Sequence, residues 1–306
     1  MKVLVIGTGS IGKRHAANLE ALGAAVETVS MRAGGLAAAV ARIEAGADAA
    51  VIATETQIRL PLIEAAAARE IALYVEKPLA PDPETVSAIY KAAGPVLKRS
   101  VVGFMMRYHP AIRRLAEEDF SDAYRYGFEI GHDVTKWREN WSFAESYAAR
   151  PEGGGVLLDL CHELDLAHCL FPGVLSDVEC LGHVRYPGVD FATQVARAGP
   201  VQGTVAMDYL APEPIRRIEI AGAGRRRTLD LLTGIYRAGA EESRFPVERN
   251  DMFRAILQDF LDLARGRAPS PVEHLPRLDL VRASCEEIAK AREMRRFTGH
   301  LEGSGP

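Results

Sequence analysis

A glycine-rich turn near the start of the chain constrains the fold more than any other feature. Residues 3–6 form a short apolar run, typical of a parallel strand buried on both faces, and apolar positions at helical spacing follow the turn. In such a strand–turn–helix the first glycine makes the tight turn, the second lets the backbone approach a pyrophosphate, and the third lets the helix pack on the strand. The segment predicts a dinucleotide contact made by Gly7, Thr8, Gly9, Ser10, Ile11 and Gly12.

Strands and helices alternate over the first third of the chain. Further strands are expected at residues 26–29, 49–53, 72–75 and 101–104, and helices at 36–45, 60–69 and 85–93. Alternation of this kind predicts parallel βαβ units with right-handed crossovers. We therefore expect residues 1–120 to form a Rossmann domain, a doubly wound parallel sheet that binds a dinucleotide.

The pattern changes from about residue 123. Strands joined by short turns are expected at residues 124–130, 178–185, 191–197, 203–209, 217–221 and 227–231, and helices at 155–171, 251–265 and 275–293. The pattern predicts an open, mostly antiparallel sheet with helices in residues 121–306, an α+β domain that binds the substrate.

Composition excludes several classes of partner. Apolar residues make up 48% of the chain and the formal net charge is −4, so nucleic acid is not expected as a partner. No apolar stretch is long enough to span a bilayer, and residues 1–7 lack the features of a signal peptide. The four cysteines form no C-x-x-C pair, so reduced thiols in a cytoplasmic protein are expected and a zinc cage is not.

The end of the second strand bears on the choice of dinucleotide. NAD enzymes usually place an acidic residue there to bind the ribose 2′-hydroxyl, but this chain reads Val29-Ser30-Met31-Arg32. Ser30 and Arg32 can instead hold a 2′-phosphate, which slightly favours NADP over NAD. The alternative, in which Arg32 is simply exposed to solvent, leaves NAD open.

Lys77 is the first candidate catalytic residue. It follows the strand at residues 72–75, and open α/β sheets bind ligands at the carboxyl ends of their strands. Pro78 disfavours helical geometry at Lys77 and so helps to fix its direction. A lysine there can polarise the reacting oxygen; the alternative is an ordinary surface lysine.

The helix expected at residues 155–171 supplies further candidates. Apolar side chains fall on one side, and Asp159, His162, Glu163 and Asp165 fall on the other. His162 can exchange a proton near neutral pH, and Asp159 or Asp165 can orient its ring. In the alternative reading this polar side simply faces water. One histidine and three acids on so short a segment cannot surround an ion, so no metal is expected.

Several motifs in order resemble the glucose–fructose oxidoreductase / inositol dehydrogenase (Gfo/Idh/MocA) family, over nearly the whole chain. They are the glycine turn with Arg14-His15, Ala53-Thr54-Glu55-Thr56, Glu76-Lys77-Pro78, Gly103 with Arg107 and Pro110, and Gly153-Gly154-Gly155 leading to Asp159, His162 and Asp165. The resemblance implies a Rossmann domain, a C-terminal α+β domain, homodimers or homotetramers through its sheet, and NAD(P)-linked chemistry on sugars and polyols.

The chain departs from the family pattern in three respects, one of which is the missing acid after the second strand. Glu55 replaces a proline and Arg59 a histidine, so the loop on the cofactor side is expected to differ. Asp159 and His162 are three residues apart where many members have four. That spacing also resembles a branch associated with nucleotide-sugar biosynthesis.

The resulting hypothesis is a hydride transfer between nicotinamide and a carbinol or carbonyl carbon. Lys77, His162 and Asp159 are the expected catalytic residues, and Thr54, Glu76 and Lys77 are expected to contact the cofactor. The expected substrate contacts are Lys77, Arg107, Tyr147, Asp159 and His162, with Tyr108, His109, Lys136 and Arg150 as further candidates.

Two other functions stay open on the sequence alone. An apolar, aromatic cleft would indicate a reductase of a non-sugar carbonyl or imine. A dinucleotide-binding sensor without turnover needs only the glycine turn, whereas Lys77, Asp159 and His162 together favour catalysis. The sequence does not specify the substrate, the carbon attacked, the direction of reaction or the oligomer size.

Overall fold

The computed structural model describes residues 1–136, 142–267 and 274–303, which form two compact units. The first unit comprises residues 1–108 and 248–286, and the second comprises residues 109–247 and the segment from Glu287 onwards. The predicted boundary at residue 120 divides the chain differently, because residues 248–286 group with the first unit. The packing explains this: Phe260 contacts Tyr74 edge-on in the core of the first unit, with ring centroids 5.9 Å apart.

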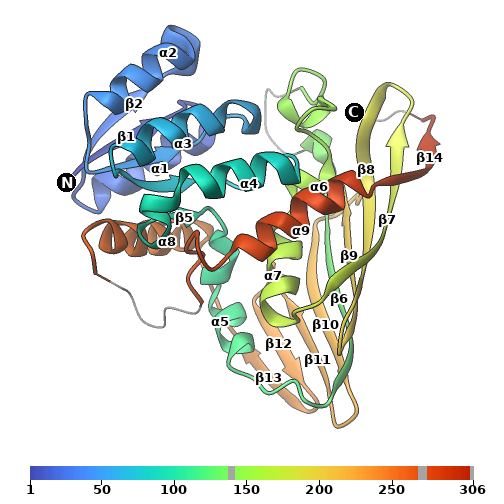
Figure 1. Ribbon diagram of the computed structural model, residues 1–306. Helices are drawn as coiled ribbons and strands as arrows, with labels where there is room; N and C mark the ends of the chain where they lie inside the picture. Colours follow the sequence, from blue (N-terminus) through green and yellow to red (C-terminus); the bar gives the residue numbers. More distant parts are fainter. Residues whose placement is uncertain (137–141, 268–273, 304–306) are drawn as a thin grey trace. The chain divides into compact units, whose positions relative to one another are not determined.

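Five parallel strands form the sheet of the first unit, as predicted (Figure 1). In sheet order they are β2 (Ala25–Val29), β1 (Lys2–Ile6), β3 (Ala49–Ile52), β4 (Ala72–Val75) and β5 (Val101–Val102). Every residue of β3 and β4 is buried, as their continuous apolar sequence requires. β5 is shorter than expected, because a 3₁₀ turn at Met105–Tyr108 follows closely.

The order in which strands are added to this sheet changes direction at β1: β2 lies on one side of β1, and β3, β4 and β5 follow on the other side. The helices of the unit are α1 (Ser10–Ala21), α2 (Met31–Glu44), α3 (Arg59–Ala68), α4 (Pro83–Ala92) and α8 (Arg249–Ala264). Since the crossovers are right-handed, α1 covers one face of the sheet, while α3 and α4 cover the other. In open sheets ligands bind outside the carboxyl ends of the strands at such a reversal. Here those ends carry the glycine turn and the loop that begins at Ala53.

A nine-stranded sheet forms the second unit and is mostly antiparallel, as predicted; only the β6–β9 and β7–β14 pairs are parallel. In sheet order the strands are β13 (Glu241–Arg244), β12 (Ile235–Ala238), β11 (Arg226–Asp230), β10 (Ile215–Gly222), β6 (Ala123–Gly131), β9 (Gln202–Asp208), β8 (Tyr186–Ala198), β7 (Val174–His183) and β14 (Arg296–Leu301). Sequence reasoning missed β12, β13 and β14. All four residues of β13 are exposed, so no apolar alternation marked it.

The single helix predicted at residues 155–171 is wrong, because two helices occupy this segment: α6 (Val156–Asp159) and α7 (His162–Leu170). Helix α6 ends at Asp159. The Leu160 amide still donates to the Val156 carbonyl, but the backbone of Leu160 no longer has helical geometry. Apolar residues precede and follow this break at helical spacing, so the sequence pattern does not reveal it. All residues from Gly154 to Ala167 are buried.

The last helix, α9 (Arg282–Glu293), starts seven residues later than predicted. Residues 275–281 instead run along the edge of the first sheet, where Val102 donates to the Pro276 carbonyl and Leu278 donates to the Ser100 carbonyl. An edge strand with unpaired backbone groups attracts such pairing. The second unit also contains α5 (Pro110–Ala116).

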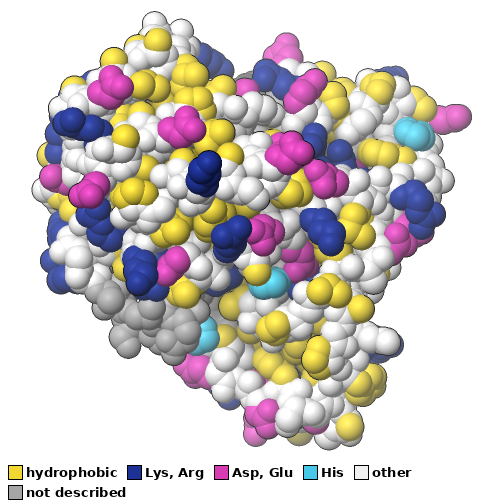
Figure 2. All heavy atoms as spheres, viewed as in Figure 1, with side chains coloured by type: hydrophobic (Ala, Val, Ile, Leu, Met, Phe, Trp, Pro, Cys, Tyr) yellow, Lys and Arg dark blue, Asp and Glu magenta, His cyan; other side chains and the backbone are white. Residues whose placement is uncertain are grey.

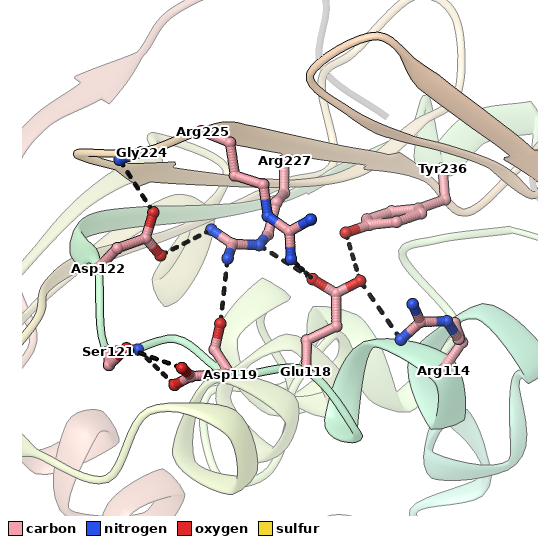
Figure 3. Close-up of polar contacts among 9 residues, drawn as sticks. All are labelled: Arg114, Glu118, Asp119, Ser121, Asp122, Gly224, Arg225, Arg227 and Tyr236. Atoms are coloured by element: carbon pink, nitrogen blue, oxygen red, sulfur yellow. Dashed lines mark hydrogen bonds and ion pairs between the residues drawn. The ribbon is translucent and has the colours of Figure 1, made fainter.

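A buried ionic network fixes the segment after α5 to the hairpin of β10 and β11 (Figure 3). The Arg227 guanidinium donates to Glu118 (3.0 Å) and to Asp122 (3.1 Å), and the Tyr236 hydroxyl donates to Glu118 (2.6 Å). Arg226 pairs with Glu219 on the same hairpin. The three consecutive arginines at residues 225–227 therefore each pair with an acidic side chain of the same unit.

Charged side chains of both signs are mixed over the face drawn in Figure 2. Within the described ranges, no helix has the length and hydropathy needed to cross a membrane.

Candidate functional site

The glycine turn between β1 and α1 is shaped by close backbone packing. Gly7 has a φ of +104°, and a Cβ there would lie 2.4 Å from the Ala53 carbonyl oxygen. A Cβ on Gly12 would lie 1.9 Å from the Gly7 carbonyl oxygen. These two positions therefore require glycine for the turn and for the contact of α1 with the sheet.

The middle of the turn is open and suits an anion. Gly9 is exposed, and a Cβ there would meet no atom within 4 Å. Gly9 precedes the twelve-residue helix α1, whose first turn carries no acidic side chain. The backbone N–H groups and dipole at this helix end favour phosphate. Thr8 and Ile11 are half-buried beside Gly9, while Ser10 is exposed.

No acidic residue occurs between Thr28 and Ile43, around the end of β2. Ser30 precedes α2, and its side chain makes no capping hydrogen bond there. Arg32 is exposed in the first turn of α2. The acid nearest in sequence is Glu27, and a hydrogen bond from Arg42 lowers its pKa. These residues therefore fit a 2′-phosphate better than a free 2′-hydroxyl.

A buried His15–Glu76 pair links the glycine turn to the Glu76-Lys77-Pro78 segment. The Nε2 atom of His15, in α1, lies 2.7 Å from Glu76 Oε1, and the side chains are 0% and 9% exposed. Burial alone raises the pKa of Glu76, but the hydrogen bond and charge of His15, with the charges of Lys77 and Arg59, bring it below its usual value. Since Glu76 is ionised at neutral pH, His15 Nε2–H is the donor.

Two groups hold the backbone around Lys77. The Lys77 amide donates to Glu76 Oε2 over 3.2 Å. Arg59, at the start of α3, donates to the carbonyls of Glu76 and Pro78. The Lys77–Pro78 peptide bond is cis, and the Lys77 side chain is half-buried.

Arg59 also reaches the loop after β3. Its Nε and Nη2 atoms donate to the Thr54 carbonyl at 3.1 and 2.7 Å. The Thr54 hydroxyl donates to the Glu55 carbonyl. Arg59 thus connects the loop that follows β3 with the loop that follows β4.

Asp159 is the centre of a buried polar group in the second unit. It is 5% exposed and accepts hydrogen bonds from the hydroxyls of Tyr147 and Tyr209, the latter over 3.1 Å. Burial, and then the charge of Asp159, raise the pKa of Tyr209 well above its ordinary value. Two phenol donors suit an ionised carboxylate and fix its orientation.

His162 and Glu163 begin α7 and are both buried, so the alternative in which the polar side of this segment faces water is wrong. Glu163 accepts a hydrogen bond from Arg216 Nε of β10 over 2.6 Å. Another histidine, His132, stands edge-on to Tyr209 with centroids 5.9 Å apart. Burial lowers its pKa, although the charge of Asp159 opposes this.

A second buried ionic group positions α7. Arg197 of β8 donates to Glu287 at 2.5 and 3.0 Å, and His168 of α7 lies 2.7 Å from the same carboxylate. Arg197 also donates to the Phe171 carbonyl, just after α7. Burial raises the pKa of Glu287, but His168 and Arg197 bring it below its usual value. The helix is therefore held at its carboxyl end.

The predicted glycine turn before α6 also has a steric cause. Gly155 has a φ of +93°, and a Cβ there would lie 2.1 Å from the carboxylate of Asp190. That carboxylate accepts from the Leu157 amide over 2.9 Å. A Cβ on Gly154 would lie 2.4 Å from the Ala148 carbonyl oxygen.

Some predicted substrate residues have structural partners. Arg107 is buried with Nη2 3.5 Å from Ser284 Oγ, and Tyr108 donates to Asp259 over 2.7 Å. His109 is buried and caps α5, and burial lowers its pKa to about 4. Three further candidates are exposed: Tyr147, which donates to Asp159, Arg150, and Lys136, which pairs with Asp133.

Sequence reasoning missed the roles of His15, Arg59, Tyr209 and His132. The sequence did contain a signal for the His15–Glu76 pair: a histidine on the buried side of a helix, and an acid directly after a buried strand. Nothing local marks Tyr209, which is 50 residues from Asp159. In the part of the chain that the structure describes, no group of three or more His, Cys, Asp or Glu side chains can hold a metal ion.

Comparison with known proteins finds sequence similarity to two dehydrogenases. No family model matches the chain. The chain is 26% identical over 296 residues to the UDP-N-acetylglucosamine 3-dehydrogenase of Acidithiobacillus ferrooxidans, covering 88% of this chain and 90% of the relative. It is 30% identical over 184 residues to the inositol 2-dehydrogenase of Rhizobium meliloti, covering 54% of this chain and 53% of the relative.

Solved structures agree on the fold. A structure of the Acidithiobacillus ferrooxidans enzyme matches with a TM-score of 0.74 and 20% identity, covering 96% of this chain and 95% of that chain. A 3-ketoreductase from Actinomadura kijaniata, in complex with TDP-benzene and NADP, matches with a TM-score of 0.74 and 15% identity, covering 98% and 99%. At these identities the structures establish the fold alone.

The His15–Glu76 pair makes stability depend on pH. A carboxyl group whose pKa is lower in the folded than in the unfolded state stabilises fully above the unfolded value, and loses this effect as pH falls through the folded value. We expect Glu76→Gln to lower the free energy of unfolding by about 2 kcal/mol at pH 5 to 7. The difference should shrink below pH 4.5, the ordinary value for glutamate.

Urea unfolding followed by circular dichroism measures this difference. Glu20→Gln is the control, because Glu20 is exposed on the same helix as His15; it should change stability by less than about 0.5 kcal/mol. Equal effects of the two substitutions at pH 7 would contradict a stabilising role for the pair.

Proposed function

We infer that this chain belongs to the Gfo/Idh/MocA family of oxidoreductases and is an NAD(P)-dependent dehydrogenase or reductase. It transfers a hydride between nicotinamide and a carbinol or carbonyl carbon of a sugar, polyol or nucleotide sugar. The observation that carries the proposal is the buried His15–Glu76 pair, which ties Lys77 to the helix of the glycine turn. A dinucleotide sensor without turnover would not need a lysine fixed in this way.

The first unit would bind the cofactor, which when bound supplies the hydride acceptor or donor. The α1 N–H groups would hold the pyrophosphate, with Gly9 leaving room for it. Ser30 and Arg32 would hold a 2′-phosphate, so we propose NADP as the preferred cofactor. Thr54 and Glu76 belong to the two loops at the same edge of the sheet.

Lys77 and His162 would carry the proton chemistry. Lys77 would hydrogen-bond the substrate oxygen and stabilise negative charge on it. His162 would exchange the proton of that oxygen, and Asp159, fixed by Tyr147 and Tyr209, would stabilise the charged imidazole. His132 is the alternative proton carrier, because it also feels the charge of Asp159.

A nucleotide sugar is the substrate class that we favour. The relative aligned over most of this chain acts, by its name, on UDP-N-acetylglucosamine, and the Actinomadura kijaniata neighbour was solved with TDP-benzene. Arg216 of β10 and the exposed Tyr147 and Arg150 would contact the sugar or its phosphates.

We further propose a cytoplasmic homodimer or homotetramer. The outer face of the nine-stranded sheet carries small side chains, Thr204 and Ala206 of β9 beside Gly127 of β6, and charged pairs such as Arg217–Glu129. Small residues let a second sheet approach closely, and the family assembles through this sheet. The cytoplasmic location rests on cysteine spacing without a disulfide pattern.

The choice of cofactor can be tested by fluorescence titration with NADPH and NADH. We expect NADPH to bind about tenfold more tightly, the equivalent of one charge-assisted hydrogen bond. Ser30→Asp should reverse the preference by repelling the 2′-phosphate, whereas Lys91→Ala, on an exposed site of α4, should not change it. Equal binding of both dinucleotides would exclude a role for Ser30 and Arg32, and binding of neither would remove the dehydrogenase proposal.

The catalytic roles can be tested with UDP-N-acetylglucosamine and inositol as trial substrates. Lys77→Ala should lower kcat by about 100-fold or more while the Kd for NADPH stays unchanged. His162→Ala should lower kcat and remove its pH dependence near neutrality. A pH profile that survives His162→Ala but disappears in His132→Ala would assign the proton transfer to His132, and full activity of Lys77→Ala would exclude its role.

The assembly can be tested by light scattering. The wild type should have a mass of two or four times 33.3 kDa. Thr204→Arg should give monomers, because it places a charge in the proposed interface, while Ser87→Arg on the exposed side of α4 should not. A monomeric wild type would overturn the proposed assembly.

A further inference from the structure

We propose that Arg59 is a positioning residue for Lys77, acting through the backbone on both sides of it. The inference rests on the proposed function, since it assumes that Lys77 acts on the substrate oxygen. It adds a role for a residue that departs from the family pattern and that has no expected contact with the substrate.

The contacts of Arg59 enclose Lys77 in the sequence. Its Nη1 atom donates to the carbonyls of Glu76 and Pro78, the residues directly before and after Lys77. The Lys77 amide is held separately, by Glu76 Oε2 at 3.2 Å. The α-carbon of Lys77 therefore lies in a short segment that is anchored at each end and at its own amide.

Arg59 is itself fixed. Its side chain is 4% exposed, and it starts α3 immediately after the 3₁₀ turn Thr56–Ile58. Its Nε and Nη2 atoms both donate to the Thr54 carbonyl, so the guanidinium plane is held from the β3 side as well. The group therefore bridges two loops with one rigid plane.

The chemistry of the guanidinium suits this position. Carbonyl oxygens only accept hydrogen bonds, and arginine offers five N–H donors in one fixed plane. Lysine offers three donors from a single atom, and histidine at most two, so neither can bind all three carbonyls with this geometry. The ionised Glu76 carboxylate compensates the buried charge, since Arg59 is among the groups that lower its pKa.

Fixing the backbone matters because a lysine side chain has several rotatable bonds. Binding sites work best when the reacting group is already oriented, and a misplacement of about 1 Å can cost about 100-fold in rate. Loss of Arg59 should therefore reduce kcat strongly. It should leave the Kd for NADPH within about threefold, because the N-terminus of α1 and the glycine turn would bind the pyrophosphate.

The test compares Arg59→Met, Arg59→Lys and Arg59→His with the wild type. For each variant we would measure kcat, KM, the Kd for NADPH, the melting temperature and hydrogen exchange of the peptide around Lys77. Arg99→Met is the matched control, because Arg99 also donates to a carbonyl, that of Glu70, in the same unit. The histidine variant restores the residue that many family members carry.

The expected result is a kcat about 100-fold lower in Arg59→Met, with the Kd for NADPH unchanged within threefold and faster exchange confined to residues near Thr54 and Lys77. Arg59→Lys and Arg59→His should recover part of kcat, and Arg99→Met should match the wild type. An unchanged kcat would overturn the inference. The inference would also be overturned if hydrogen exchange became faster over the whole first unit and kcat, the Kd and the melting temperature all changed together. That result would show that Arg59 only stabilises the fold.

Failure of the proposed function would be distinguishable. If the wild type binds no dinucleotide or turns over no substrate, the enzymatic proposal falls, and hydrogen exchange still decides the positioning role. Faster exchange near Lys77 alone in Arg59→Met, with a retained melting temperature, would support it. Unchanged exchange would overturn it.

Discussion

The buried hydrogen bond between His15 and Glu76 is the interaction on which the carboxyl edge of the first sheet depends. It joins two segments 61 residues apart: the helix that starts at the glycine turn and the turn that carries Lys77. Neither side chain is tolerable alone in the core, because an unpaired buried charge costs several kcal/mol. The pair therefore joins α1 to the segment that carries Lys77, and Arg59 completes the same edge.

The second unit also buries polar side chains, at the end of α6 and the start of α7. Asp159, His162 and Glu163 all lie inside the unit, where two tyrosines donate to Asp159 and Arg216 donates to Glu163 Oε1. Buried polar groups require such partners, and the partners come from strands far along the chain.

Features with local causes could be predicted from the sequence. The glycine turn, the continuous apolar strands of the first sheet and the alternating strands of the second each follow from neighbouring residues, and the structure confirms them. The break at Leu160 and the late start of α9 could not be predicted, because apolar periodicity continues through the first and pairing with β5 decides the second. Tyr209 acts through a contact with Asp159, 50 residues away, so its sequence neighbours carry no signal. Arg59 is marked in the sequence only as a change of loop, because its contacts with the carbonyls of Glu76 and Pro78 are tertiary.

Arg59 shows how a departure from a family pattern can be interpreted. The replacement of histidine by arginine first indicates an altered loop on the cofactor side. The structure places the guanidinium on three carbonyls instead, two of which flank Lys77. The charge of this larger group is compensated by the Glu76 carboxylate beside it; burial raises the pKa of Glu76, but the hydrogen bond and charge of His15 and the charge of Arg59 help to bring it below its usual value. The substitution at residue 59 and the buried pair are therefore parts of one electrostatic arrangement, and a change in one alters the other.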